Sequence, residues 1–351
     1  MVERPAVPPR SPALPARTSE GAAVTRPSTT AHLAEVLRVE DMTPAFRRVV
    51  LGGEGMAEFG IDHHPLDQRF KLIIPPGGGD PAFDLVDFLE SHQSDDLSWY
   101  QAWLQVDEDV RGAMRTYTIR DWDEAARELV VDMVLHTDEH GVGGPAGSWA
   151  QAVRPGGRLH LIGPRRGGEQ SRSGIEFEPG GAKDLLLVGD ETAVPAIASI
   201  LESLRGSDVR GRALLEVPTA ADRLDLEGPA GVEVVWLARD GAEHGSLLEP
   251  AVREAVAADA DLPADPSAGE RVELEDVDID STILWEVPQH LTHAAHGSTS
   301  EVHPDERPFY AWIAGEAGVV KRLRRYLVRE IGVDRKQVAF MGYWRIGKAE
   351  G

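Results

Sequence analysis

The stretch LLLVGDETAVPAI, residues 185–197, decides the fold of the C-terminal half of this chain. It opens with a continuous apolar run, Leu185–Val188, which is typical of a strand buried on both faces of a parallel sheet. Gly189 and Asp190 end that strand, and a helix is predicted to follow at once over 194–204, with its apolar residues on one stripe. A buried strand that runs directly into an amphipathic helix predicts a doubly wound α/β domain.

The same alternation of strands and helices continues toward the C-terminus. Further strands are predicted at 212–217, 232–237, 309–314 and 336–342, and a helix at 319–331. We therefore expect a nucleotide-binding α/β domain with a parallel sheet over residues 183–351.

An acidic segment at about 258–304 interrupts this domain. Residues 254–304 hold twelve Asp or Glu against a single Arg, so we expect a solvated, partly disordered insertion. The segment also contains histidines at helical spacing, His290, His293 and His296, with His303 nearby. An exposed polar helix face is the favoured interpretation, because no second cluster of metal ligands is evident, and we predict no metal site.

The junction between the strand at 185–190 and the helix after it is the position at which such folds bind nucleotides. Asp190, Glu191 and Thr192 are therefore candidate nucleotide-binding residues. The generic dinucleotide fingerprint GxGxxG is absent, and Asp and Thr at a helix start are also ordinary N-caps. Both interpretations stay open at this point.

The N-terminal half has a different pattern. Short strands are predicted at 32–39, 46–51, 69–75, 128–136 and 158–162, separated by Gly and Pro, with a helical insertion at about 85–104. This spacing indicates a small antiparallel β-barrel, which we place at residues 31–178. Residues 1–30 contain six prolines and many small polar residues, so we expect a disordered tail.

The hexapeptide RTYTIR, residues 115–120, lies in this half. Strand alternation places Arg115, Tyr117 and Ile119 on one face, and Thr116 and Thr118 on the other. An Arg that forks a phosphate, a Tyr ring that covers a flavin and a Thr hydroxyl near the flavin nitrogen would together suit a flavin nucleotide. The alternative is an edge strand with an exposed Arg and Tyr.

Two further features follow the hexapeptide. Asp132 and His136 share one face of their predicted strand. A glycine-rich stretch then runs into a helix start, where free backbone N–H groups suit a pyrophosphate: Gly144, Pro145, Ala146, Gly147, Ser148 and Trp149. The alternative for this stretch is a glycine-rich turn capped by Ser148.

The composition excludes several classes of function. The chain has 351 residues, a formal net charge of −23 and no cysteine. The negative charge argues against nucleic acid and anionic membranes as partners, and no apolar run is long enough to span a bilayer. Without cysteine, iron–sulfur clusters and thiol redox relays are excluded, so electron transfer would need an organic cofactor. No apolar signal segment is present at the N-terminus, and we expect a cytoplasmic location.

Further motifs complete the pattern: WLAR at 236–239, WIAGEAGVVKRLRRYL at 312–327 and GYWRIG at 342–347. With RTYTIR, DMVLH (132–136), GPAGSWA (144–150) and GDETAVPAI (189–197), they resemble the siderophore-interacting protein family, the FAD-dependent ferric-siderophore reductases of the ferredoxin–NADP reductase superfamily. The resemblance implies two domains, an antiparallel β-barrel that binds FAD and a doubly wound α/β domain that binds NADPH or NADH. It also implies an anionic ferric siderophore as substrate, and we expect a monomer.

By this resemblance Arg115, Tyr117 and Thr118 hold the flavin, and His136 and the turn from Gly144 to Trp149 hold the rest of FAD. Further candidate cofactor-binding residues are Thr116, Asp132, Tyr343 and Trp344. One position departs from the family, which usually has Ser after Gly-Pro-Ala, where this chain has Gly147. Ser148 substitutes for it, or the phosphate relies on backbone amides alone.

Basic residues complete the predicted site. The family holds its anionic substrate in a small basic pocket, which implies Lys71, Arg165 or Arg166, and Arg345 as substrate-binding residues. For any one of these residues taken alone, a solvated surface charge is the favoured interpretation. Arg239 ends a strand of the nucleotide domain. In one interpretation it meets the 2′-phosphate of NADPH, and in the other it is an ordinary charged residue of a loop.

The function predicted from the sequence is a reductase that passes electrons from NAD(P)H through FAD to iron(III) in a siderophore and releases iron(II). No catalytic acid or base is predicted, because the cofactor performs the redox chemistry. Two alternatives stay open: a flavin-dependent reductase of another acceptor, such as free flavin or a quinone, and a non-catalytic carrier of ferric siderophore.

Overall fold

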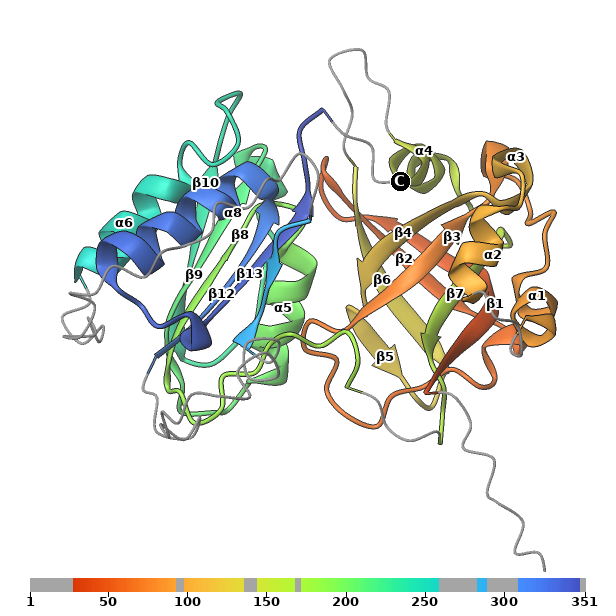
Figure 1. Ribbon diagram of the computed structural model, residues 1–351, viewed down its shortest axis with the longest axis horizontal. Helices are drawn as coiled ribbons and strands as arrows, with labels where there is room; N and C mark the ends of the chain where they lie inside the picture. Colours follow the sequence, from red (N-terminus) through yellow and green to blue (C-terminus); the bar gives the residue numbers. More distant parts are fainter. Residues whose placement is uncertain are drawn as a thin grey trace, which may run out of the picture.

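The computed structural model describes residues 28–92, 98–135, 144–167, 172–258, 283–288 and 309–347. Two sheets lie side by side, each with its own helices (Figure 1). The expected tail up to residue 27, His136 and the four histidines of the acidic insertion fall outside the described residues. Within the described residues, none of the helices combines the length and apolar content that crossing a bilayer requires.

The N-terminal sheet is antiparallel throughout. Within the described residues it has seven strands in the order β4-β3-β7-β1-β2-β6-β5. The chain after β4 returns to β6, where Arg120 N donates to Val130 O (3.0 Å), and this contact curls the sheet into the predicted barrel. The strands are β1 (Thr29–Asp41), β2 (Phe46–Gly52), β3 (Arg69–Ile74), β4 (Ala113–Thr118), β5 (Asp121–Asp123), β6 (Glu128–Val134) and β7 (Arg158–Pro164).

Helices cover two sides of the barrel (Figure 1). Helix α4 (Pro145–Ala152) closes one end, where Trp149 and Ala150 are buried in the barrel core. The insertion predicted as helical forms α1 (Leu85–Ser91), α2 (Trp99–Leu104) and α3 (Glu108–Arg111) on the outer flank. Trp103 and Leu85 pack there against Ile73 of β3.

The C-terminal sheet is parallel except for one edge strand. Its order is β10-β9-β8-β12-β13-β11, so the strand order reverses between β8 and β12. In doubly wound folds this switch point opens a crevice at the carboxyl ends of the strands, where ligands bind. The strands are β8 (Asp184–Gly189), β9 (Arg210–Val217), β10 (Gly231–Ala238), β11 (Trp285–Glu286), β12 (Phe309–Glu316) and β13 (Val338–Trp344).

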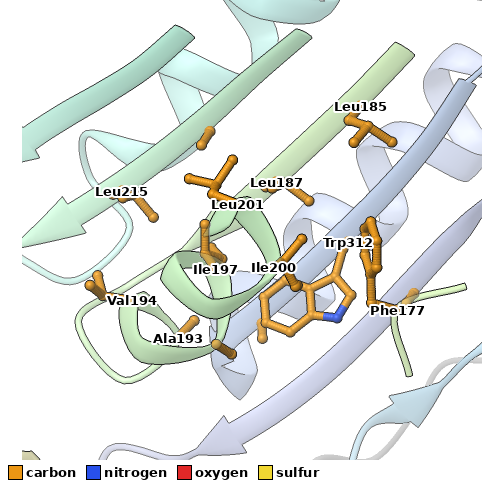
Figure 2. Close-up of a cluster of buried hydrophobic side chains, with 14 of the residues drawn as sticks. Phe177, Leu185, Leu187, Ala193, Val194, Ile197, Ile200, Leu201, Leu215 and Trp312 are labelled. Atoms are coloured by element: carbon orange, nitrogen blue, oxygen red, sulfur yellow. The ribbon is translucent and has the colours of Figure 1, made fainter. Parts of the chain in front are cut away.

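Helices lie on both faces of this sheet. Helices α6 (Leu248–Ala258) and α8 (Ala317–Arg324) cover the face away from the barrel, and α5 (Val194–Ser203) lies on the face toward it (Figure 1). The apolar stripe of α5, with Ile197, Ile200 and Leu201, packs against the sheet beside Trp312 (Figure 2). The doubly wound architecture predicted from residues 185–197 is therefore confirmed.

Four short helical turns complete the described chain. They are the 3₁₀ turns η1 (Glu54–Met56), η2 (Pro76–Gly78), η3 (Ala220–Asp222) and η6 (Arg335–Gln337). The helix predicted at 319–331 continues past α8 as a π-helical segment, η5 (Arg325–Ile331).

Two sequence expectations were wrong in part. Strand β1 begins at Thr29, inside the expected tail, because Thr29 and Thr30 pair with β7. The insertion is expected to be solvated and partly disordered, but its residues 283–288 return to the fold, where Leu284 and Val287 are buried and β11 pairs with β13. Apolar side chains among the acidic residues explain why this part of the insertion packs.

Candidate active site

Strand β4 presents the hexapeptide as the alternation predicted. Arg115 and Tyr117 lie opposite Leu72 and Phe70, which belong to the barrel core, so these side chains share the inner face. Thr116 and Thr118 share the outer face with β3, and Lys71 Nζ donates to Thr116 Oγ1 (2.6 Å).

Arg115 has unused hydrogen-bonding capacity. Its guanidinium donates through one terminal nitrogen to Met114 O (2.8 Å). Within the part of the chain that the structure describes, the other terminal nitrogen has no protein partner. A half-buried guanidinium with free donors suits a phosphate.

The first turn of α4 is open in the same way. Gly144 is its N-cap, is exposed and makes no side-chain cap hydrogen bond, and Pro145 follows at the first position. Gly147 is half-buried and Ser148 is exposed, whereas Ala146 and Trp149 face the barrel core. Only the backbone amides and Ser148 of this turn are therefore placed to meet a phosphate, while Trp149 holds the helix on the barrel.

Asp132 has a structural role that the sequence did not reveal. Its carboxylate accepts both ends of the Arg48 guanidinium (2.7 and 2.8 Å), and Arg120 Nε lies 3.2 Å away. The Asp132 side chain is fully enclosed. Both oxygens already face arginines, so the contact between Asp132 and the cofactor stays a prediction that would require this cluster to rearrange.

The switch point is built around Asp190, at the end of β8. Its carboxylate accepts from Thr192 N (2.9 Å), Glu316 N (2.7 Å) and Trp344 Nε1 (2.8 Å), so it joins the ends of β8, β12 and β13. Gly315 permits this approach, because its φ is +143° and a Cβ there would lie 2.6 Å from Asp190 Oδ2. Burial, and then the neighbouring Glu191, raise the pKa of Asp190 to about 7.

A buried charge cluster lies beside Asp190. Arg239 forks the carboxylate of Glu191 (2.6 and 2.8 Å), and its NH1 is 3.4 Å from Glu216. Glu216 also accepts from the amides of Gly245 and Leu248. The side chain of Arg239 is 7% exposed, so contact with a 2′-phosphate would require this pair to open.

An aromatic group from the C-terminal motif lies between the two sheets. Tyr343 and Trp285 stack with ring centroids 5.8 Å apart, and Trp312 meets Tyr343 edge-on at 6.1 Å. The Tyr343 hydroxyl is buried and, within the described residues, has no hydrogen-bond partner. Sequence reasoning identified Tyr343 and Trp344 but missed Trp285, whose isolated position in an acidic segment gave no signal.

Asp67 joins the barrel to the nucleotide domain and was also missed. Its carboxylate accepts from Trp312 Nε1 (2.9 Å) and from the amides of Glu176 and Phe177 (3.1 Å each). Burial raises its pKa to about 6. A second link joins Arg120 to Glu202 of α5 (2.6 Å at both ends).

The structure does not gather all the predicted substrate-binding cations. Lys71 lies on the outer face of β3, and Arg345 follows β13. Arg165 pairs with Glu58 (2.9 Å) and Arg166 with Glu124, next to the bridge between Phe59 and Arg165 at one end of the barrel. Arg69, missed by sequence reasoning, lies on the same face as Lys71 and pairs with Glu176 (2.5 Å).

These residues fit FAD at three places. The Arg115 guanidinium has donors beyond the one used on Met114 O, the N-cap of α4 makes no side-chain hydrogen bond, and the buried Tyr343 hydroxyl has no partner among the described residues. Among the described residues, no group of three or more candidate metal ligands occurs.

Two family models match this chain. The siderophore-interacting FAD-binding domain matches residues 35–168, and the siderophore-interacting protein model matches residues 182–347. The chain belongs to the siderophore-interacting protein family. Its barrel corresponds to the siderophore-interacting FAD-binding domain.

Individual relatives of this family align over nearly the whole chain. Uncharacterized protein Rv2895c of Mycobacterium tuberculosis is 34% identical over 91% of this chain and 92% of its own length. Ferric vibriobactin reductase ViuB of Vibrio cholerae is 27% identical over 91% of this chain and 90% of its own. A siderophore utilization protein from T. fusca has a similar structure, with a TM-score of 0.59, 27% identity, and coverage of 92% and 95% of the two chains.

Proposed function

We propose that this protein is an FAD-dependent reductase of ferric siderophores that takes its electrons from NADPH or NADH and releases iron(II). The observation that carries the proposal is an FAD-binding barrel, with the Arg115–Thr118 segment on its strand β4, joined to a second, doubly wound sheet. The similarity to a ferric vibriobactin reductase supports the siderophore as substrate. Bound FAD would supply the redox chemistry, because a flavin can take two electrons from a reduced nicotinamide and pass them on singly to iron(III).

The residues of this chain supply binding and orientation. Arg115 and the first turn of α4 would hold the diphosphate, since both offer N–H donors. Tyr117, on the face of Arg115, would lie along the isoalloxazine. The links from Asp67 to Trp312 and from Arg120 to Glu202 hold the two sheets in one arrangement, so a nucleotide at the switch point and a flavin on β4 would keep a fixed separation.

The substrate would be recognised by charge. Among the predicted cations, Lys71 lies beside strand β4 and Arg345 belongs to the C-terminal motif, while Arg165 and Arg166 pair with Glu58 and Glu124 at one end of the barrel. In a protein of net charge −23, a local cationic surface is needed to attract an anionic complex. Iron(II) is held more weakly than iron(III) by the hard oxygen ligands of a siderophore, so reduction releases the metal.

The test begins with the purified protein reconstituted with FAD under anaerobic conditions. NADPH and NADH are added in separate samples, and the loss of visible flavin absorbance is followed, with heat-denatured protein as the control. Addition of a ferric catecholate should restore the absorbance and yield iron(II) in a chelator assay. A protein that is reduced but passes electrons only to quinones would establish another acceptor, and one that binds ferric siderophore without FAD would establish a carrier.

A further inference from the structure

Strand β11 is a short addition at the edge of the α/β sheet, and it lies inside the acidic segment. It is tied to the domain by buried neighbours and by ion pairs. Glu286 accepts from Arg324 (2.6 Å) and Arg335 (2.6 Å), and Gly342 N donates to Leu284 O (2.7 Å). A two-residue strand held this firmly has a fixed position, so the side chain of Trp285 is fixed with it.

Trp285 connects the β11 edge with strand β3 of the barrel. Its indole Nε1 donates to Glu176 Oε1 (3.2 Å), and the Arg69 guanidinium lies 4.2 Å from its ring centroid. Arg69 is the register partner of Thr118, the last residue of the Arg-Thr-Tyr-Thr strand. Trp285 therefore lies close to the end of β4 at which the flavin is proposed to bind.

Tyr343 depends on this position of Trp285. The Tyr343 ring stacks on the Trp285 indole with an interplanar angle of 12°. The Trp312 ring meets Tyr343 edge-on, with an interplanar angle of 87°. Burial, and then the nearby Asp67, raise the pKa of the Tyr343 hydroxyl well above its ordinary value, so the group is a neutral donor. Among the residues that the structure describes, this buried hydroxyl has no partner, which is costly and makes a bound molecule a candidate acceptor.

We propose that Trp285 is a positioning residue that holds the ring of Tyr343 so that its hydroxyl donates to the isoalloxazine of FAD. The proposal rests on the proposed function, because it takes the ligand to be FAD. The proposal gives the acidic insertion a role at the active site, because residues 283–288 would then form one side of the flavin site. The insertion is then required for correct flavin binding even though its composition is that of a solvated segment.

The test measures FAD binding to apoprotein by quenching of flavin fluorescence, together with the visible spectrum of the bound flavin. Tyr343→Phe should raise the Kd for FAD about fivefold, the usual worth of one neutral hydrogen bond. Trp285→Ala should raise it by at least the same factor and shift the flavin absorption bands. Trp285→Phe, which keeps a ring for stacking, should stay within about twofold of wild type. Ile283→Ala is the matched control, because Ile283 is 74% exposed and precedes the same strand.

The double variant Trp285→Ala/Tyr343→Phe separates positioning from general structural damage. If Trp285 acts through the hydroxyl, the double variant binds FAD no more weakly than Trp285→Ala, so the two effects are not additive. Fully additive effects, or a Trp285→Ala protein with the wild-type Kd and spectrum, would overturn the proposal. A wild-type protein that does not bind FAD would instead refute the proposed function itself. Near-ultraviolet circular dichroism reports whether each variant is folded. If Trp285→Ala is not folded, Trp285→Leu replaces it in both the single and the double variant, because leucine keeps apolar bulk but offers no ring for Tyr343 to stack on.

Discussion

The carboxylate of Asp67 holds the barrel to the nucleotide domain, and its removal should have a cost that depends on pH. Asp67→Ala leaves three buried donors without their acceptor: Trp312 Nε1 and the amides of Glu176 and Phe177. Each such donor costs about 1–3 kcal/mol. Part of this cost is offset at high pH. There the wild-type protein is itself destabilised by an ionised, buried carboxylate, and Asp67→Ala removes that penalty.

The magnitude of that offset follows from the pKa of Asp67. Burial raises it from 3.8 to about 6, which corresponds to about 3 kcal/mol for the ionised form. The folded protein therefore holds the proton more tightly than the unfolded chain. The contribution of this group to stability is complete below pH 3.8 and is lost as the pH rises through 6. We expect Asp67→Ala to lower the free energy of unfolding by about 3 kcal/mol at pH 8 and by about 2 kcal/mol more at pH 4.5.

The assay is urea unfolding of wild type and variant at the two pH values, followed by tryptophan fluorescence. Asp62→Ala is the matched control, because Asp62 is exposed and lies in the same loop, and it should change the unfolding free energy by less than about 0.5 kcal/mol. An Asp67→Ala cost that is equal at both pH values, or larger at pH 8, would refute the reasoning about burial of this carboxyl.

Three other perturbations test the site. Arg115→Ala should weaken FAD binding at least tenfold, from loss of a phosphate contact worth about 1.5–3 kcal/mol, in a fluorescence titration in which the exposed Arg38→Ala is unchanged; an unaltered Kd would remove Arg115 from the site. Lys71→Ala should raise KM for an anionic ferric complex while the rate of flavin reduction by NAD(P)H stays the same, and the defect should shrink in 0.5 M salt. Lys183→Ala, which removes a surface ion pair with Asp208, is its control, and equal effects of both variants on KM would count against a local pocket. Deletion of residues 1–27 should leave FAD content and reduction by NAD(P)H unchanged; a large loss of either would show that this segment contributes to the flavin site.

The parts of the fold that could be predicted are those that local sequence patterns control. Alternation in RTYTIR gave the correct faces of β4, since strand periodicity does not depend on distant contacts. The junction at Gly189 and Asp190 correctly marked the switch point, because a buried strand followed by a helix has few other architectures available.

The parts that could not be predicted depend on contacts between residues far apart in the chain. Asp67 and Trp312 are 245 positions apart, and neither residue type indicates from the sequence that it has a partner so far along the chain. The sequence offers three arginines as candidates to bind an anionic ligand, but each faces a carboxylate in the structure: Arg165, Arg166 and Arg239. Ion pairing is decided by tertiary geometry, so a sequence lists candidates for a basic pocket but does not select among them.

The acidic insertion illustrates the same limit in the opposite direction. Its composition predicts solvated chain, and composition averages over the short apolar run that contains Leu284, Trp285 and Val287. That run packs because strand β13 offers it a free edge.

The most direct test of the central claim is the delivery of electrons to iron. Protein loaded with FAD is reduced anaerobically with one equivalent of NADPH or NADH and mixed rapidly with excess ferric catecholate in the presence of an iron(II) chelator. Reoxidation of the flavin should coincide with chelator absorbance equivalent to about two iron(II) ions per FAD, because a two-electron carrier reduces iron(III) in single-electron steps. Reduced protein that keeps its bleached flavin when the ferric complex is added, or that reoxidises without forming iron(II), would contradict the assignment as a ferric-siderophore reductase.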